Sequence, residues 1–258
     1  MTAKKAVISG GSKGIGYAIA RRLAEEGAEV GLIASNEERL KNAAQRIRKE
    51  TGRRAVYHAI DLRTHEGCEE AHRAIGDALG GCDILVNSAG ATKGGVWPEQ
   101  PDEEWEDGFA LKFYSAVRLA RLFWPALVAA GGTVINIVGG FARTPAAGFM
   151  VGGVVNAALA NFSKSLAAQG LRDDVNVNWV HPGLTVTERL DQIFDGRARQ
   201  QGKTRNQVEQ ETIAHEGIRR LGQPEDVAAL VAFLCSDGGR HIHGTAVQID
   251  GGGTPGYY

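Results

Sequence analysis

The sequence predicts an α/β protein with a single doubly wound parallel sheet of about seven strands and helices on both faces. Short β-branched and apolar runs alternate with amphipathic segments along the whole chain of 258 residues. Such alternation implies right-handed crossovers between strands, which make the sheet parallel. Some runs, such as residues 84–86, are wholly apolar, as a strand covered on both faces requires. No linker or repeat divides the chain, so residues 1–258 are expected to form one domain.

The predicted strands are short, and helical patterns with apolar residues at intervals of three and four lie between them. The strands are expected at residues 5–9, 29–34, 55–60, 83–87, 133–138, 175–180 and 246–249. The helices are expected at residues 15–26, 37–51, 66–79, 102–130, 151–170 and 224–236.

One segment interrupts this alternation. Residues 185–222 are polar and helix-prone, and they stand between the last two expected strands. Ligands of open parallel sheets bind outside the carboxyl ends of the strands, where such a connection would lie. The segment is therefore predicted to be a lid-like insertion over a binding site.

Composition excludes several classes of protein. The 29 basic and 30 acidic residues give a net charge of −1, without the basic excess typical of nucleic-acid binders. No apolar run is long enough to span a membrane, and the N-terminus lacks a signal-peptide core, so a cytoplasmic protein is expected. Cys68, Cys82 and Cys235 form no CxxC pair, so neither a metal site nor a disulfide framework is predicted.

A glycine-rich turn follows the first expected strand. It reads Gly10-Gly11-Ser12-Lys13-Gly14-Ile15-Gly16, and a helix begins there. Glycines allow a tight turn and a close approach of the backbone to a ligand. The start of the helix offers free N–H groups and the positive end of its dipole. Since the turn lies directly after a strand, a dinucleotide phosphate site is favoured over a ligand-free turn.

From this turn onward the sequence resembles the short-chain dehydrogenase/reductase family. The turn is similar to the family's TGxxxGIG element, with Ser9 in place of the threonine. Further family landmarks follow in order along almost the whole chain: Asp61-Leu62, Asn87-Ser88-Ala89-Gly90, Trp105, Asn136-Ile137, His181-Pro182-Gly183 with Thr187, Pro224 to Ala228, and Asp250-Gly251-Gly252.

The resemblance implies a Rossmann-type sheet, a nicotinamide dinucleotide, a small-molecule substrate and a homotetramer. It also implies which residues line the cofactor site: Gly10, Ser12, Lys13, Gly14, Ile15, Gly16, Ser35, Asn36, Asp61, Leu62, Asn87, Ala89, Gly90, Pro182, Gly183 and Thr187. The tetramer would be built on the helices at residues 102–130 and 151–170.

The end of the second strand indicates which cofactor is preferred. An acidic residue there would bind the ribose hydroxyls of NAD and repel the 2′-phosphate of NADP. This chain has Ala34-Ser35-Asn36, without a carboxylate, and Lys13 could contact a 2′-phosphate. NADP(H) is therefore favoured over NAD(H).

The family's catalytic residues are an Asn, a Ser, a Tyr and a Lys, and none is found at its matching position. Local matching places Lys112 at the Asn, Gly139 at the Ser, Gly152 at the Tyr and Asn156 at the Lys. No tyrosine occurs between Tyr114 and Tyr257, so no shift of register restores a YxxxK motif. Loss of the Tyr and Lys contacts to the ribose predicts that nucleotide binding survives but is weakened, with absence of binding as the alternative.

Two features of this region suggest other chemistry. The Asn and Lys of the family are exchanged here, so Lys112 could bring an ammonium into the same cavity; the alternative is that it points to solvent. His181 could act as an acid or base, or be a loop residue with one backbone hydrogen bond. Loss of the Ser and Tyr side chains predicts an enlarged pocket, unless Phe141, Phe149 or Met150 fills it.

The sequence is compatible with two functions. The first is a divergent enzyme that acts on a carbonyl or hydroxyl small molecule by another mechanism, with Lys112 or His181 as candidate catalytic residues. The second is a non-catalytic nucleotide-binding protein, either a sensor or a partner subunit of an active homologue.

Overall fold

A computed structural model describes residues 4–255 and confirms the predicted sheet. The strands are β1 (Lys5–Ser9), β2 (Glu29–Ala34), β3 (Ala55–Ala59), β4 (Ile84–Asn87), β5 (Thr133–Ile137), β6 (Asn176–Pro182) and β7 (Ala246–Ile249). They form one seven-stranded sheet in the order β3-β2-β1-β4-β5-β6-β7, and every neighbouring pair is parallel.

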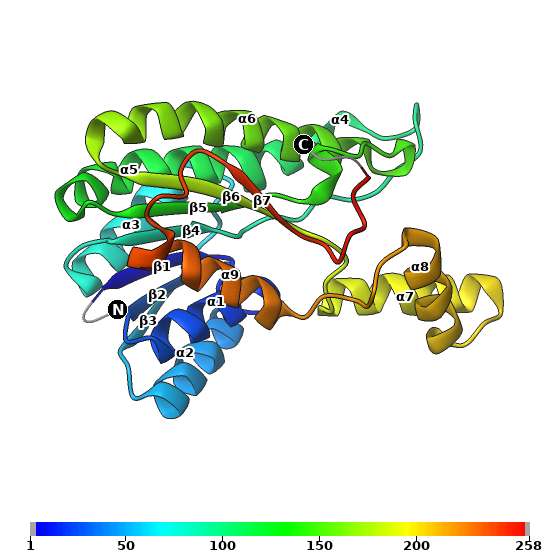
Figure 1. Ribbon diagram of the computed structural model, residues 1–258, viewed down its shortest axis with the longest axis horizontal. Coiled ribbons are helices and arrows are strands. Elements are labelled where there is room, and N and C mark those ends of the chain that lie inside the picture. The colour runs from blue at the N-terminus through cyan, green and yellow to red at the C-terminus, as the bar shows by residue number, and fades with distance from the viewer. Residues whose placement is uncertain (1–3, 256–258) are drawn as a thin grey trace.

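Two layers of helices cover the sheet (Figure 1). On one face α1 (Gly14–Glu25), α2 (Glu37–Thr51) and α9 (Pro224–Leu234) bury an apolar core that includes Ile19, Leu40 and Val231. On the other face α3 (His65–Leu79), α5 (Ser115–Ala130) and α6 (Met150–Asp173) bury a second core around Ile75 and Phe123. Burial on both faces explains why the strand sequences are almost continuously apolar.

The order of the strands creates a crevice between β1 and β4. The chain runs outward from β1 through β2 to β3 and then returns to β4 on the other side of β1. The turns after β1 and β4 therefore meet at the carboxyl edge of the sheet, where such folds bind ligands. They touch closely, because a Cβ at Gly10 would lie 2.9 Å from the backbone nitrogen of Ala89.

The prediction of one regular helix at residues 102–130 is wrong in one respect. The structure divides it into α4 (Asp102–Gly108), a π-helical segment η1 (Phe109–Tyr114) and α5. A π-helical insertion is invisible to a periodicity of 3.6 residues, and such insertions occur frequently at functional sites. Lys112 lies on this segment.

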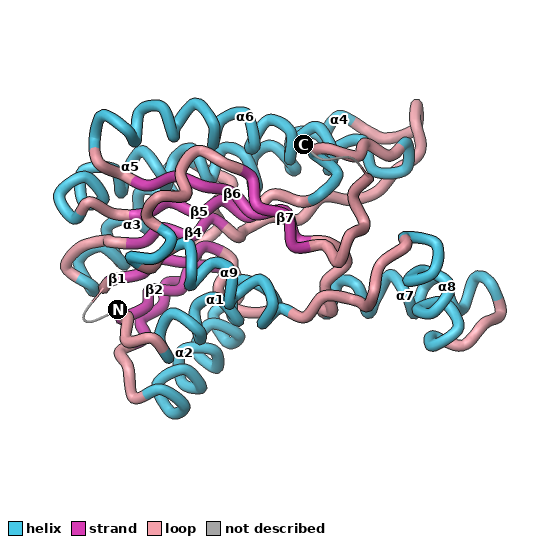
Figure 2. The backbone as a smooth tube through the Cα atoms, in the orientation of Figure 1, coloured by secondary structure: helices cyan, strands magenta, loops and turns pink. Residues whose placement is uncertain are grey.

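The predicted insertion contains two helices, α7 (Glu188–Gln201) and α8 (Arg205–Glu216), which project from the body of the molecule (Figure 2). They pack on each other through a small apolar cluster that includes Leu190, Phe194 and Val208. A β-bridge between Thr185 and Gly222 joins the two ends of the insertion. Across the described residues 4–255, no helix is both long and apolar enough to cross a bilayer.

Candidate functional site

The glycine-rich turn and the start of α1 form a preorganised anion site. Gly10 and Gly14 have φ angles of 70° and 56°, a left-handed conformation that favours glycine. A Cβ at Gly16 would lie 2.3 Å from the carbonyl oxygen of Gly10, so the helix must begin close to the turn. Helix α1 has no side-chain cap and no acidic residue in its first turn. Its first N–H groups can therefore serve an anion such as a pyrophosphate.

Ser9 connects this turn to the loop after β4. Its hydroxyl accepts hydrogen bonds from the backbone N–H groups of Ser88 and Ala89, both at 3.2 Å. Ser9 therefore supplies the hydroxyl expected of a threonine at this position.

Two basic side chains meet one carboxylate beside the turn. Lys13 Nζ lies 2.6 Å and Arg39 Nη1 lies 3.3 Å from Oε2 of Glu188, the first residue of α7. Hydrogen bonding to Lys13 lowers the pKa of the Glu188 carboxyl. The sequence prediction singled out Lys13 but did not name Arg39, which lies in the helix expected at residues 37–51. The signal that could have identified Arg39 is a basic residue three positions after Asn36, shortly after the end of β2.

Asn36 and Ser35 take different positions at the end of β2. The Asn36 side chain accepts a hydrogen bond of 2.8 Å from the backbone of Arg39 and so caps α2. Ser35 is exposed beside it. The cap fixes the first turn of α2, and with it the position from which Arg39 reaches Glu188.

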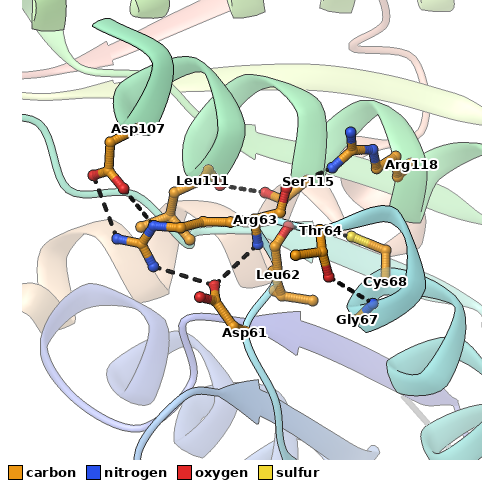
Figure 3. A network of polar contacts seen from close by, with 10 residues as sticks. All are labelled: Asp61, Leu62, Arg63, Thr64, Gly67, Cys68, Asp107, Leu111, Ser115 and Arg118. Atoms are coloured by element: carbon orange, nitrogen blue, oxygen red, sulfur yellow. Dashed lines mark hydrogen bonds and ion pairs between the residues drawn. The ribbon is translucent and has the colours of Figure 1, made fainter. Parts of the chain in front are cut away.

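Asp61 belongs to a polar network after β3 (Figure 3). Its Oδ1 accepts hydrogen bonds from the backbone nitrogen and the Nη1 of Arg63, at 3.0 and 3.2 Å. The same guanidinium donates to Asp107 on α4, and Arg118 on α5 donates to the carbonyl of Arg63. Leu62 is buried between these groups. The network fixes the β3–α3 turn against α4 and α5, with the Asp61 carboxylate still half exposed.

Asn87 lies in the interior at the end of β4. Its Nδ2 donates to Asn136 at 2.9 Å, and Asn136 in turn donates to Ser163 at 2.8 Å. This chain of hydrogen bonds joins β4, β5 and α6. The Asn87 side chain therefore holds the strand ends together, and it does not reach into an open cleft.

The predicted contacts after β6 lie against the glycine-rich turn. The Thr187 side chain caps α7, and its methyl carbon is 3.4 Å from the place of a Cβ at Gly14. Gly183 packs against Asp250, whose Cα would be 2.7 Å from a Cβ at residue 183. Pro182 ends β6. The insertion thus starts directly above the anion site.

The positions matched to the catalytic Ser, Tyr and Lys lie together and bond to one another. Asn156 is buried, and its Oδ1 accepts from the backbone N–H of Gly139 at 2.7 Å. Its Nδ2 donates to the carbonyl of Gly152 at 2.6 Å. Both ends of the Asn156 amide are therefore occupied within this cluster.

The enlarged pocket expected beside these glycines is not formed. A Cβ at Gly152 would lie only 1.9 Å from Cε1 of Phe149, so the Phe149 ring covers this position. The ring packs on Phe141, with the two centroids 4.8 Å apart. The sequence prediction named Phe149 as a residue that could fill this space, and its ring replaces the missing volume.

Lys112 lies beside the loop after β4. Its side chain is partly buried, and its Cδ is 2.9 Å from where a Cβ at Gly90 would be. Within residues 4–255 its ammonium has no hydrogen bond and no carboxylate partner. Burial, assisted by the nearby charge of Arg189, lowers its pKa to about 8. The ammonium therefore loses its proton more readily than that of an exposed lysine.

His181 is a buried residue of β6 and does not lie in a loop. Its Nδ1 lies 3.0 Å from the carbonyl oxygen of Val138, so Nδ1 carries the proton and Nε2 is an acceptor. Burial lowers the pKa of His181, which favours the neutral ring. The residue lines a cavity of about 540 Å³ together with Arg143 and Gln248.

Comparison with known proteins agrees with this architecture. Residues 10–254 match the family described as enoyl-(acyl carrier protein) reductase. The chain is 32% identical over 260 residues to the 3-oxoacyl-[acyl-carrier-protein] reductase FabG of Vibrio cholerae, covering 96% of each protein. It is 31% identical over 262 residues to dehydrogenase/reductase SDR family member 4 of Mus musculus, covering 98% of this chain and 87% of the relative.

Solved structures agree as well. L-sorbose reductase from Gluconobacter frateurii, complexed with NADPH and L-sorbose, superposes with a TM-score of 0.96 and 34% identity, covering 100% of this chain and 98% of that one. A short-chain dehydrogenase from Burkholderia cenocepacia in complex with NADP superposes with a TM-score of 0.86 and is 30% identical in sequence, with 98% of each chain covered. The sheet order, the glycine-rich turn and these matches together show that the chain belongs to the short-chain dehydrogenase/reductase family of oxidoreductases.

Proposed function

We propose that this protein binds NADP(H) and acts as an oxidoreductase on a small carbonyl or hydroxyl compound, without the family's Ser-Tyr-Lys proton transfer. The similarity to proteins solved with NADPH or NADP supports the cofactor. The glycines at positions 139 and 152, and Asn156 with both ends of its amide hydrogen-bonded, support a different route for the proton.

The residues at the cleft fit a phosphorylated dinucleotide. The free N–H groups at the start of α1 would hold the pyrophosphate, and Lys13 and Arg39 would hold the 2′-phosphate in place of the Glu188 carboxylate. When bound, NADPH supplies a hydride. The α7–α8 insertion would act as the lid, because Thr187 and Glu188 already contact the turn.

Lys112 carries the proposal. An oxygen that gains negative charge during carbonyl reduction needs a proton donor or a cation, and general acid catalysis contributes about 10²–10⁴-fold. Lys112 is a partly buried ammonium with no carboxylate partner among the described residues, and its pKa of about 8 keeps it protonated at pH 7. His181 suits this role less, because Nε2 of its neutral ring carries no proton to give.

The test measures NADPH oxidation with a panel of ketones, aldehydes and oxo acids, together with NADPH binding by calorimetry. Lys112→Met should lower turnover by about 10²–10⁴-fold and leave NADPH binding within a few fold of the wild type. In the reductive direction, kcat/KM should fall as the pH rises through about 8, because the donor loses its proton.

Lys41→Met is the matched control, since Lys41 is an exposed lysine of α2. It should change neither turnover nor binding. No heat with NADPH at millimolar concentration, or full activity in Lys112→Met, would contradict the proposal. Binding without turnover on any substrate would favour a non-catalytic sensor or partner subunit.

A further inference from the structure

Two cations lie along one segment of backbone, residues 90–94, beside the proposed reaction site. The stem of Lys112 packs against Gly90, and Nη2 of Arg189 donates to the carbonyl oxygen of Thr92. Phe149 reaches the same segment at Gly94, where its Cδ2 is 3.8 Å from the place of a Cβ. The Arg189 guanidinium carbon is 5.7 Å from the centroid of the Phe149 ring. Backbone and aromatic contacts therefore hold the Arg189 guanidinium, and the stem of Lys112 packs on the same segment.

Neither cation has an ionic partner in the described part of the chain. The carboxylates nearest to Arg189 in the sequence are used elsewhere: Glu188 pairs with Lys13 and Arg39, and Asp191 pairs with Arg205. Beside the same segment, Glu104 pairs with Lys93 and bonds to Gln100. Among residues 4–255, the hydrogen bond of Arg189 goes to a carbonyl oxygen, and most of its N–H groups stay available at an accessible surface.

Bringing two like charges together without an anion costs free energy. That cost is visible in Lys112, whose pKa is lowered partly by the charge of Arg189. A small anion between the two side chains would relieve the repulsion and satisfy the guanidinium, which matches the planar fork of a carboxylate or the oxygens of a phosphate.

We propose that Arg189 is a specificity-determining residue and that the substrate is anionic, a small carbonyl compound carrying a carboxylate or phosphate. Arg189 binds this oxyanion, and Lys112 faces the reacting oxygen. This inference rests on the proposed function, since it names the substrate class of the same site. It makes the lid helix α7 a recognition element, because Arg189 is its second residue.

The test measures binding and not turnover. Calorimetry on protein saturated with NADP⁺ compares each anion with its neutral counterpart: 2-oxo-4-phenylbutanoate with its methyl ester, and dihydroxyacetone phosphate with dihydroxyacetone. At least one anion should bind about tenfold or more tightly than its counterpart. The two pairs distinguish a carboxylate from a phosphate. The preference should shrink as salt increases.

Arg189→Gln should abolish that preference and leave binding of the neutral compound unchanged, and Arg189→Lys should retain part of it. Arg197→Gln is the matched control, because Arg197 is exposed on the same helix. Equal affinity for both members of each pair, or no binding of either anion, would overturn the inference. So would loss of NADP⁺ affinity in Arg189→Gln, because Arg189 would then serve the nucleotide.

Failure of this inference and failure of the proposed function give different results. Anion binding through Arg189 without any turnover contradicts the proposed function alone. Turnover that depends on Lys112 but shows no preference for anions contradicts this inference alone.

Discussion

The ring of Phe149 lies against Gly152, with Cε1 1.9 Å from the place where a Cβ of residue 152 would stand. The Phe149 ring thus occupies the space that a side chain at residue 152 would need. Phe149 is itself held by the ring of Phe141 and by the guanidinium of Arg189. These contacts leave no room for a larger side chain at residue 152.

Gly152→Ala should therefore destabilise the protein. In an open helix this change is favourable by about 1 kcal/mol, because alanine has the higher helix propensity. Here the added methyl group would displace Phe149, and such overpacking costs about 1–3 kcal/mol. Urea denaturation should show a net loss of stability for Gly152→Ala alone. In a Phe149→Ala background the same substitution should be neutral or stabilising, and an equal loss in both backgrounds would contradict this account.

Lys112 should make stability depend on pH in a defined range. A lysine in an unfolded chain has a pKa of about 10.4, and the folded value is about 8. Between these values the unfolded chain binds more protons, so this residue makes stability rise with pH there. Below pH 8 the cost of burying the charge is fully present.

Lys112→Met should therefore raise the free energy of unfolding at pH 7 by about 1–3 kcal/mol and remove the rise between pH 8 and 10. Urea denaturation at several pH values measures both effects. The exposed Lys41→Met should follow the wild type. If the free energy of unfolding of Lys112→Met still rose between pH 8 and 10, another titrating group would be responsible for the rise.

Lys13 and Arg39 should determine the preference for NADP⁺ over NAD⁺. Each is an accessible cation that now contacts Glu188. Replacing either by Gln should weaken NADP⁺ binding by about 1 kcal/mol, roughly fivefold, and leave NAD⁺ binding unchanged. Glu188→Gln should strengthen NADP⁺ binding, because the competing carboxylate is removed. Calorimetry with both nucleotides measures this, and Lys41→Gln is the control. Equal losses for NAD⁺ and NADP⁺ would refute the assignment.

Much of the fold could be predicted because local patterns determine it. The bounds of β1, β2, β7 and α2 agree with the sequence prediction to the residue. Helix α2 illustrates why: Asn36 caps its start and Gly52, with a φ of 69°, ends it. Both signals are readable in the sequence. Strand β6 runs two residues further than predicted, to Pro182, so His181 became a buried strand residue.

The site was harder to predict because its contacts join distant segments. Arg39 and Glu188 are far apart in the sequence, and each looks like an ordinary surface residue of its own helix. Whether Phe149 fills the space beside Gly152 depends on a loop conformation that no periodicity encodes. The environment of Lys112 depends on the π-helical segment, which pattern matching read as regular helix.

The protein should form a homotetramer through α5 and α6, which lie on the same face of the sheet (Figure 1). Both helices expose large apolar side chains, among them Val128 on α5, and Val154 and Leu171 on α6. Light scattering should give four times the chain mass at micromolar concentration, and Val154→Glu should reduce it. Ile193→Glu, at an exposed apolar residue of α7, is the control. A monomeric wild-type protein would refute the prediction.

The unmodified protein should reduce neutral ketones at rates near background, and restoring the family's residues should create this activity only if Phe149 is also removed. The restored set is Gly139→Ser, Gly152→Tyr, Asn156→Lys and Lys112→Asn. A tyrosine at residue 152 has no room beside the Phe149 ring, and a Cβ at residue 139 would lie 3.0 Å from Nδ2 of Asn156. The changes therefore depend on one another sterically as well as chemically.

With Phe149→Ala added, the five-substitution variant should oxidise NADPH measurably with neutral ketones. The four-substitution variant that retains Phe149 should stay inactive or lose stability, and no single restoration should suffice, because catalytic residues act as a unit. Circular dichroism and NADPH calorimetry must first show that each variant folds and binds nucleotide. Activity in the four-substitution variant would show that Phe149 is no obstacle. Robust reduction of neutral ketones by the unmodified protein would contradict this prediction. It would show that this protein has an efficient proton donor for neutral substrates.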